Sequence, residues 1–538
     1  MNKPILIKWM LALAVALSPV LALGQTSDAV LRDKMTNAVM KVYDDHLAQN
    51  PNDYNILFAR AHQNYYNGDY TAALADVNQA MLLTPKTDKE LRFDEHILRA
   101  RISEARQDYA SELADLNLAQ ELQPKSLACT DMIAKANFKA GNLDAAEKAF
   151  KKILRAESMN YDAMYGLARV YQARGNAKAA IEQVDKAVGL FRVEPQVYVN
   201  RADIHASQGN IEAAVQDLLA GMSVGDGGNA AQALFDLSDM HYEVVMNSLL
   251  DLANKANNPD DNGIYRYLRA NIAMDHTRFA QALNDLKYIK RNRLYNSPTV
   301  DSNVAKCCLE LARWEDALTS ADLALAATTS LPEVYVVKAL AEYHQGEGGH
   351  FDNAMEALNR CSELYPQYVP MLITKALLLM KQNEDNEALS YLNAAVANDP
   401  TNSEALFLRG TLFKKNENLK LAVRDYNTIV ALVDDYHYRG MALSELGRDS
   451  EAMRWLNQVL AANQPGGENF YQASLFMALR GDNYKAMEYV QRALDKGYGS
   501  LYRLRHNDLS PVNLSSLYGE SSFDLNIDKA RRNFIESE

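Results

Sequence analysis

Apolar residues recur at three- and four-residue spacing along most of the 538-residue chain. This spacing is typical of amphipathic helices that bury one face. The helical stretches come in pairs separated by short breaks, often Gly followed by Asp or Asn, as at Gly68-Asp69. Proline closes several second helices, for example at Pro85, because its ring cannot continue a helix. The pattern predicts a series of helical hairpins.

Within the hairpins, two small residues recur twelve positions apart, and successive pairs are often 34 residues apart. The pairs with unbroken spacing are Ala61/Ala73, Ala134/Ala146, Ala168/Ala180, Ala202/Ala214, Ala270/Ala282, Ala305/Ala317, Ala376/Ala388, Gly410/Ala422, Gly440/Ala452 and Ser474/Ala486. Two copies are imperfect, Ala100/Glu112 and Ala339/Ala354. Seven residues after the first small residue, a Gly often marks the break between the two helices. Small residues are expected where two helices cross, since only a missing side chain lets the backbones approach closely.

With this period, the small-residue pairs and the closing prolines, the sequence resembles the tetratricopeptide repeat (TPR) family over roughly residues 37–500. The resemblance implies an all-α fold, a right-handed α-solenoid superhelix of about 12–13 TPR hairpins with no β domain. It also implies a protein or peptide partner, because TPR arrays serve as interaction surfaces. The fold alone does not name that partner.

The repeats divide the chain into blocks. We expect an N-terminal TPR block at 27–221, an irregular helical joint at 222–263, a C-terminal block at 264–493 and a capping tail at 494–538. The tail would cover the apolar face that a terminal repeat leaves exposed. The step from Gly410 to Gly440 is four residues short of the period, which predicts that the preceding second helix, through Ile429 to Val433, is truncated or tightly turned.

The first 24 residues have the features of a signal peptide. Lys3 and Lys8 precede a short apolar run, and small residues stand at Ala22 and Gly24. The run is shorter than the roughly 20 residues that span a bilayer. We therefore expect an exported, periplasmic chain, associated with the cell envelope, with no integral membrane segment after cleavage.

Charge and composition narrow the function. A net charge of −13 argues against nucleic-acid binding. No metalloprotease, phosphate-loop, hydrolase or dinucleotide-binding motif is present, so we expect no enzyme activity, cofactor or metal site. The Asp/Asn-rich stretch 257–263 lacks the ligand spacing of a calcium loop and is predicted to be a turn. The four cysteines are predicted to be buried thiols, with a Cys308–Cys361 bridge as the alternative.

The repeat register also projects the residues of the concave groove, which lie three before, one after and four after the first small residue. In the N-terminal block these positions are mixed and polar. In the C-terminal block they form an apolar stripe, which we define as the groove stripe: Val336, Leu340, Tyr343, Ile373, Leu377, Met380, Phe407, Thr411 and Lys414. An exposed apolar strip marks a binding site for a partner helix or extended peptide. Burial of the strip by tight superhelical curvature is the alternative.

These observations favour a non-catalytic scaffold or adaptor in the cell envelope. Two other functions stay open at this point. One is a structural spacer that associates with itself through the groove stripe. The other is a solenoid that binds carbohydrate or peptidoglycan, for which the 29 tyrosines give faint support.

Overall fold

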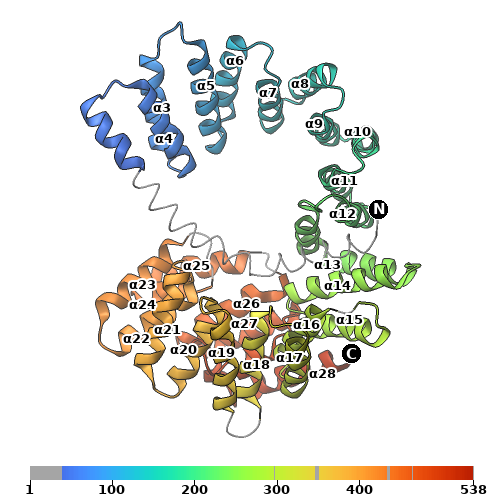
Figure 1. Ribbon diagram of the computed structural model, residues 1–538, viewed down its shortest axis with the longest axis vertical. Coiled ribbons are helices and arrows are strands. Elements are labelled where there is room, and N and C mark those ends of the chain that lie inside the picture. The colour runs from blue at the N-terminus through green and yellow to red at the C-terminus, as the bar shows by residue number, and fades with distance from the viewer. Residues whose placement is uncertain (1–38, 296, 346–349, 433–436, 463–464, 537–538) are drawn as a thin grey trace. The chain divides into compact units, whose positions relative to one another are not determined.

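A computed structural model describes residues 39–295, 297–345, 350–432, 437–462 and 465–536. The predicted signal peptide and the glycine-rich turn before His350 lie outside the described residues. Within them the secondary structure is helical, with no β-strand (Figure 1). The expectation of an all-α helical-repeat superhelix is confirmed.

The helices follow one another with short turns, beginning with a helix at residues 39–49. They are α3 (Tyr54–Tyr66), α4 (Tyr70–Leu83), α5 (Lys89–Ala105), α6 (Tyr109–Leu122), α7 (Leu127–Lys139), α8 (Leu143–Ala156), α9 (Tyr161–Ala173), α10 (Ala177–Leu190), α11 (Pro195–Ser207), α12 (Ile211–Met222), α13 (Ala230–Lys255), α14 (Pro259–Asp275), α15 (Phe279–Asn292), α16 (Pro298–Glu310), α17 (Trp314–Ala327), α18 (Pro332–His344), α19 (Phe351–Leu364), α20 (Val369–Lys381), α21 (Asp385–Asn398), α22 (Ser403–Lys415), α23 (Leu419–Ala431), α24 (Arg439–Glu445), α25 (Asp449–Ala461), α26 (Glu468–Leu479), α27 (Asn483–Asp495) and α28 (Ser521–Glu536). Short helical turns η1 (Pro465–Gly467), η2 (Tyr502–His506) and η3 (Ser515–Leu517) complete the set.

The chain forms two compact units. The described part of unit 1 runs from residue 39 to Leu237, and unit 2 runs from Ser238 to the end of the described residues. Unit 1 holds five hairpins, from α3/α4 to α11/α12, and unit 2 holds seven, from α14/α15 to α26/α27. The boundary falls inside α13, which lies in the predicted joint.

The small residues lie at the helix crossings, as predicted. All are buried, and the alanines and the serine among them are at most 3% exposed. Two first positions need glycine itself, because a Cβ on Gly410 would lie 2.7 Å from Tyr426 Cε1 and one on Gly440 would lie 2.2 Å from Trp455 Cε3. At the imperfect copy Ala100/Glu112, a buried glutamate stands at the crossing, 3% exposed.

The turn inside the hairpins has one backbone conformation wherever the structure describes it. The residue seven after the first small residue has a positive φ of 56–80° in every described copy. Glycine occupies this position at 68, 141, 175, 209, 447 and 481, whereas Gln107, Thr277, Ala312, Asn383 and Glu417 adopt it without being glycine. A left-handed residue lets the helix carbonyls be satisfied at the turn. The conformation is therefore a property of the repeat and not of the residue type.

The structure shows how the chain runs at the three irregular places in the sequence: the joint, the Asp/Asn-rich stretch and the short step before Gly440. α13 is interrupted at His241, whose φ of −135° and ψ of 42° are not helical. The Asp/Asn-rich stretch serves as a helix start, where the Asn258 side chain caps α14 by accepting from the Asp261 amide. In the described residues the shortened helix is α24, with seven residues, whereas α23 has 13. Val433, where a tight turn was the alternative, lies outside the described residues.

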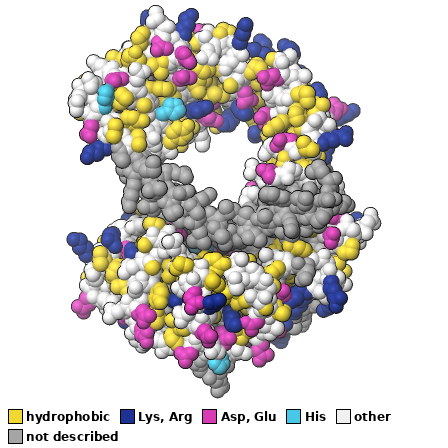
Figure 2. Space-filling model, viewed as in Figure 1, with side chains coloured by type: hydrophobic (Ala, Val, Ile, Leu, Met, Phe, Trp, Pro, Cys, Tyr) yellow, Lys and Arg dark blue, Asp and Glu magenta, His cyan; other side chains and the backbone are white. Residues whose placement is uncertain are grey.

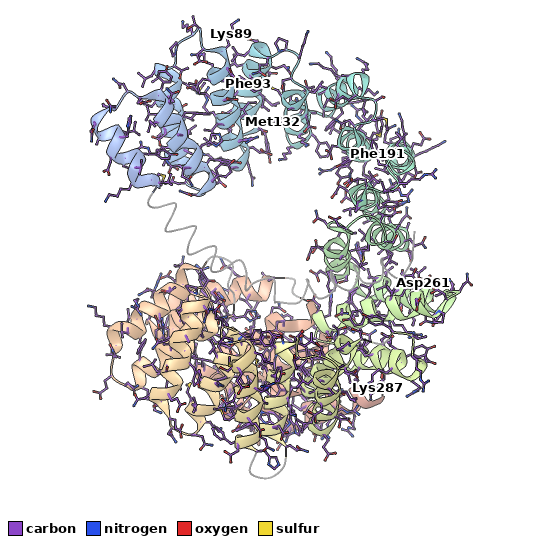
Figure 3. All side chains as sticks on the ribbon, in the orientation of Figure 1. Lys89, Phe93, Met132, Phe191, Asp261 and Lys287 are labelled. Atoms are coloured by element: carbon purple, nitrogen blue, oxygen red, sulfur yellow. The ribbon has the colours of Figure 1, made fainter. Side chains whose placement is uncertain are left out.

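Aromatic side chains pack between the two helices of a hairpin (Figure 3). Phe191, labelled in that view, lies just after α10 with its ring 5.4 Å from that of Tyr161 at the start of α9. All four cysteines are buried thiols, so the bridge between Cys308 and Cys361 is not formed.

Candidate functional site

The groove stripe lies on three consecutive first helices of unit 2, namely α18, α20 and α22. Ile373, Leu377 and Phe407 are buried, at 5%, 8% and 3% exposure. The other apolar members are half-buried: Val336, Leu340, Tyr343 and Met380. These four pack against one hydrophobic cluster, which includes Ile373 and Leu377. The register therefore brings the predicted residues together and leaves part of the stripe accessible.

The far end of the stripe is more polar and more engaged. The Phe407 ring lies 5.6 Å from that of Tyr426 and 5.3 Å from that of Tyr438, which explains its burial. The Thr411 hydroxyl donates to the Phe407 carbonyl at 2.9 Å. Lys414 is exposed, and its Nζ lies 2.5 Å from Glu445 Oε2. At this end the stripe therefore exposes the charged side chain of Lys414, whereas its apolar member, Phe407, is buried.

The C-terminal tail borders the stripe. Lys381, at the end of α20, donates to the Asp508 carboxylate at 2.8 Å and to its carbonyl at 3.1 Å. Leu509 is buried in the same cluster as the stripe, and the His344 imidazole lies 4.0 Å from Asp508. The predicted groove is thus a composite surface, with the chain's own tail forming one wall.

Further back, Arg503 of the tail lies among carboxylates. Its Nη1 is 3.5 Å from Glu468 and its Nε is 3.8 Å from Glu310. The Ser500 hydroxyl donates to Glu310 at 2.5 Å, and the Tyr471 hydroxyl donates to the Arg503 carbonyl at 3.2 Å. These contacts tie the tail to two helices that are far apart in sequence, α16 and α26.

Within unit 2, the first hairpin turn contacts two segments that are far away in sequence. The Thr277 hydroxyl donates to the Gly466 carbonyl at 3.2 Å. A Cβ on Gly499 would lie 2.4 Å from the Thr277 carbonyl oxygen, so the chain can pass there only as glycine. The turn between α14 and α15 therefore contacts both η1 and the segment that follows α27.

In unit 1, polar side chains at the predicted groove positions already contact other groove residues. Arg169 lies over the Phe138 ring at 4.6 Å, Lys135 pairs with Asp131 at 2.7 Å, and the Tyr165 hydroxyl donates to Asp203 at 2.8 Å. Burial, followed by the Asp203 charge, raises the Tyr165 pKa well above its usual range. This face therefore presents paired polar groups where unit 2 presents half-buried apolar ones.

The sequence analysis missed a recurring ion pair between the two helices of a hairpin. An Arg just before the first small residue pairs, at 2.6–2.7 Å, with an Asp sixteen residues later on the second helix of the same hairpin. The five pairs are Arg60/Asp76, Arg99/Asp115, Arg201/Asp217, Arg269/Asp285 and Arg409/Asp425. Arg60 and Arg201 also pair with an Asp sixteen residues earlier, on the preceding helix. The fixed spacing was a usable signal, because it keeps register with the small residues.

Among the described residues, one group has donor types that suit a metal ion: Asp239, Asp275 and His276. The His276 Nε2 already lies 3.1 Å from the Ser238 hydroxyl. Burial, and then the Arg278 charge, lowers the His276 pKa to about 4, so the ring is neutral near pH 7. The group is accounted for as a buried, hydrogen-bonded histidine beside two exposed carboxylates.

Figure 2 shows acidic, basic and apolar side chains interspersed on the visible face of each unit, with no large patch of one sign. None of the helices in the described residues combines the length and apolar character that crossing a membrane requires.

Known proteins match this chain through its repeats. The sequence model of the tetratricopeptide repeat matches residues 132–195, 168–222 and 373–437. The tetratricopeptide repeat and J domain-containing co-chaperone DNJ1 of Fusarium oxysporum f. sp. lycopersici is 35% identical over 95 residues, or 16% of this chain and 18% of that protein. The match thus spans under a fifth of the curated relative's length.

Solved structures are more distant. The C-terminal part of a TPR repeat-containing protein from Cytophaga hutchinsonii is 16% identical, covering 43% of this chain and 96% of that one, with a TM-score of 0.33. The complex of Naa15/Naa10 bound to HypK-THB is 15% identical, covering 95% and 96%, also with a TM-score of 0.33. Similarity at this level says nothing about a shared partner.

The recurring hairpins and the three matched segments define the class: the chain is a multi-repeat TPR protein. In general terms, a protein of this class is a protein-interaction scaffold.

Proposed function

We propose that this chain is a non-catalytic scaffold that captures a peptide or helix of a partner protein on the groove stripe of unit 2. One observation carries the proposal: Val336, Leu340, Tyr343 and Met380 lie side by side in register on α18 and α20 and are only half-buried. Apolar side chains left in contact with water on a concave surface gain free energy when a partner covers them, about 25 cal/mol per Å² of apolar area.

The surroundings of the stripe indicate what kind of segment fits. The apolar members are bordered by the Lys381–Asp508 pair at one side and by exposed Lys414 at the end. An amphipathic helix or extended segment with apolar residues facing the groove and polar residues at its edges has the matching character. The polar contacts already made within unit 1 favour unit 2 as the place of capture.

We also propose that capture takes place outside the cytoplasm, in the cell envelope. The support is the signal-peptide pattern of residues 1–24. The alternative functions, a self-associating spacer and a glycan-binding solenoid, would use the same elongated array with a different ligand.

The test replaces half-buried residues of the stripe and leaves buried ones intact. Leu340→Glu combined with Met380→Glu puts two charges on the surface, whereas Leu377 and Phe407 are avoided because they are buried and their substitution would perturb folding. The matched control is Leu323→Glu combined with Leu419→Glu, which are 50% and 60% exposed on second helices. Proteins captured from cells of the source organism are identified by mass spectrometry.

We expect the groove variant to lose a specific captured protein that the wild type and the control variant retain, with the helical circular dichroism unchanged in all three. Equal capture by the groove variant and the control would contradict the proposal. Light scattering separates the spacer, because a dimer abolished by the groove variant would identify the partner as a second copy of the chain.

A further inference from the structure

A cavity of about 720 Å³ lies in unit 2, and none of the groove-stripe residues lines it. Three segments line it: the turn between α16 and α17, the tail around η2, and α28. Its volume falls in the range of pockets that enclose small molecules, about 300–1,000 Å³.

The lining of this cavity is basic in a protein that is acidic overall. Three arginines, Arg313, Arg505 and Arg531, line it together with one acidic residue, Asp528. The Arg313 guanidinium is paired with Asp316, its Nη2 lying 2.6 Å from the carboxylate. Arg505 is held by α28, with Nη2 3.2 Å from Asp524 and Nη1 3.6 Å from Asp528. Arg531 is exposed, and within the described part of the chain it forms no ion pair.

Apolar side chains form the rest of the wall. Leu311, Leu501 and Ile527 contribute aliphatic surface, and the Trp314 indole stacks on His344 at 5.0 Å with an interplanar angle of 25°. His506 meets the Trp314 ring edge-on at 5.3 Å. Burial, and then the Arg505 charge, lowers the His506 pKa, so this ring is neutral near pH 7 and adds a hydrogen-bonding group without adding charge.

We propose that this cavity is a binding site for a small anionic molecule that carries a phosphate or carboxylate on an apolar body. Guanidinium groups bind such anions through paired N–H donors. The anionic group would lie at Arg531 and Arg505, and the apolar body against Trp314, Leu311 and Ile527. The site shares no lining residue with the groove stripe, and the inference does not rest on the proposed protein partner.

The chain offers a matched pair of variants. Arg531 lines the cavity, whereas its neighbour Arg532 does not and is also exposed on α28. Arg531→Gln and Arg532→Gln therefore remove the same charge from the same helix, and only the first removes it from the site. Trp314 supplies an optical signal, because the other tryptophan after the predicted signal peptide, Trp455, is 2% exposed.

The experiment titrates the full mature chain with phenyl phosphate, phthalate, inorganic phosphate and, as the neutral probe, benzyl alcohol, by calorimetry and tryptophan emission. We expect saturable binding of phenyl phosphate or phthalate, at least tenfold weaker in Arg531→Gln and unchanged in Arg532→Gln, and no saturation with benzyl alcohol. Comparison of the first two probes tells phosphate from carboxylate recognition.

If inorganic phosphate bound as tightly as phenyl phosphate, the proposed contact between an apolar part of the ligand and the cavity wall would be wrong. The absence of saturable binding for both aromatic anions, or equal weakening in the two arginine variants, would overturn it. Matched melting temperatures of the variants establish that the fold is retained. Failure here would leave the groove proposal untouched, since the two sites share none of the substituted residues.

Discussion

At the residue scale, the turn position of the described hairpins shows that the repeat sets the backbone conformation whatever the residue type. Gly141 and Glu417 occupy the same place in their repeats and have φ values of 78° and 60°. Glycine adopts this region without a steric penalty, whereas other residues are strained there. The repeat therefore holds Glu417 in a conformation that it does not favour.

Replacing Glu417 by glycine should stabilise unit 2 by about 0.5–1 kcal/mol, because relief of strain exceeds the extra chain entropy of the unfolded state. The converse change, Gly141→Ala, should destabilise unit 1 by about 1 kcal/mol, although no atom lies within 4 Å of the added methyl group. Urea unfolding of the two variants measures both effects. A loss of stability in Glu417→Gly would contradict the explanation.

A second residue-scale prediction concerns Glu112, which stands at a helix crossing where other repeats have alanine. Burial, and then the Glu104 charge, raises the Glu112 pKa to about 7 from its usual 4.5, and its Oε2 has no hydrogen-bond partner within the described residues. The folded state therefore prefers the protonated acid. The resulting stability is fully present below pH 4.5 and is lost as the pH rises through about 7.

Glu112→Gln keeps the shape and removes the ionisation. We expect its stability to equal that of the wild type near pH 4 and to exceed it by up to about 3 kcal/mol at pH 8. Chemical unfolding across this pH range gives the measurement, with Glu121→Gln, a glutamate near the end of the same helix, as the control that should change little. A difference that does not vary with pH would rule out Glu112 as the titrating group.

At the element scale, each hairpin depends on small residues at its crossing and, in five copies, on an ion pair whose aspartate is buried. Arg409 and Asp425 are 8% and 1% exposed, and their side chains are 2.7 Å apart. Removing one partner of a buried pair leaves the other charge without compensation, which costs about 3–5 kcal/mol.

Arg409→Met should therefore destabilise unit 2 by about 3–5 kcal/mol, and Asp425→Asn added to it should recover a large part of the loss. The surface pair Arg360–Glu363, with side chains 58% and 63% exposed, provides the comparison. Its disruption by Arg360→Met should cost less than about 1 kcal/mol. Thermal unfolding of the wild type and the three variants measures these losses of stability. An equal loss in Arg409→Met and Arg360→Met would refute the role of Arg409 in a buried ion pair.

The same scale shows what the sequence could predict. Ala61, Gly410 and the other small residues specify the crossings, since their spacing has no explanation outside a helical hairpin. Phe407 was expected in an accessible groove, yet it is buried against Tyr426 and Tyr438, because the shape of the next repeat cannot be derived from register alone. The position of Arg503 could not be predicted either. Its contact with Glu310 joins two segments that are more than 150 residues apart in the sequence, and the repeat register does not relate them.

At the scale of the whole molecule, the tail is part of the core of unit 2 and not a loose cap. Leu504, Leu514 and Leu517 are completely buried. Burying each such side chain contributes about 1.5–3 kcal/mol, so displacement of the tail by a partner would cost more than most peptides gain. The partner surface must therefore be the part of the groove stripe that the tail leaves accessible.

Leu504→Ala should destabilise unit 2 by about 2–5 kcal/mol. Leu525→Ala, at a position of the tail that is 63% exposed, should change stability by less than about 0.5 kcal/mol. Calorimetric melting curves of the full chain test the pair. A small effect of Leu504→Ala would mean that the tail is weakly held and can be displaced.

The central claim, capture of a polypeptide on the groove stripe, is tested most directly by site-specific photocrosslinking in living cells. Benzoylphenylalanine is placed at Tyr343, half-buried in the stripe, or at Tyr484, 79% exposed on a second helix. The account predicts a discrete crosslinked protein from position 343 that disappears when Leu340→Glu and Met380→Glu are added, and none from position 484. The same crosslinks from both positions, or none from position 343, would contradict it.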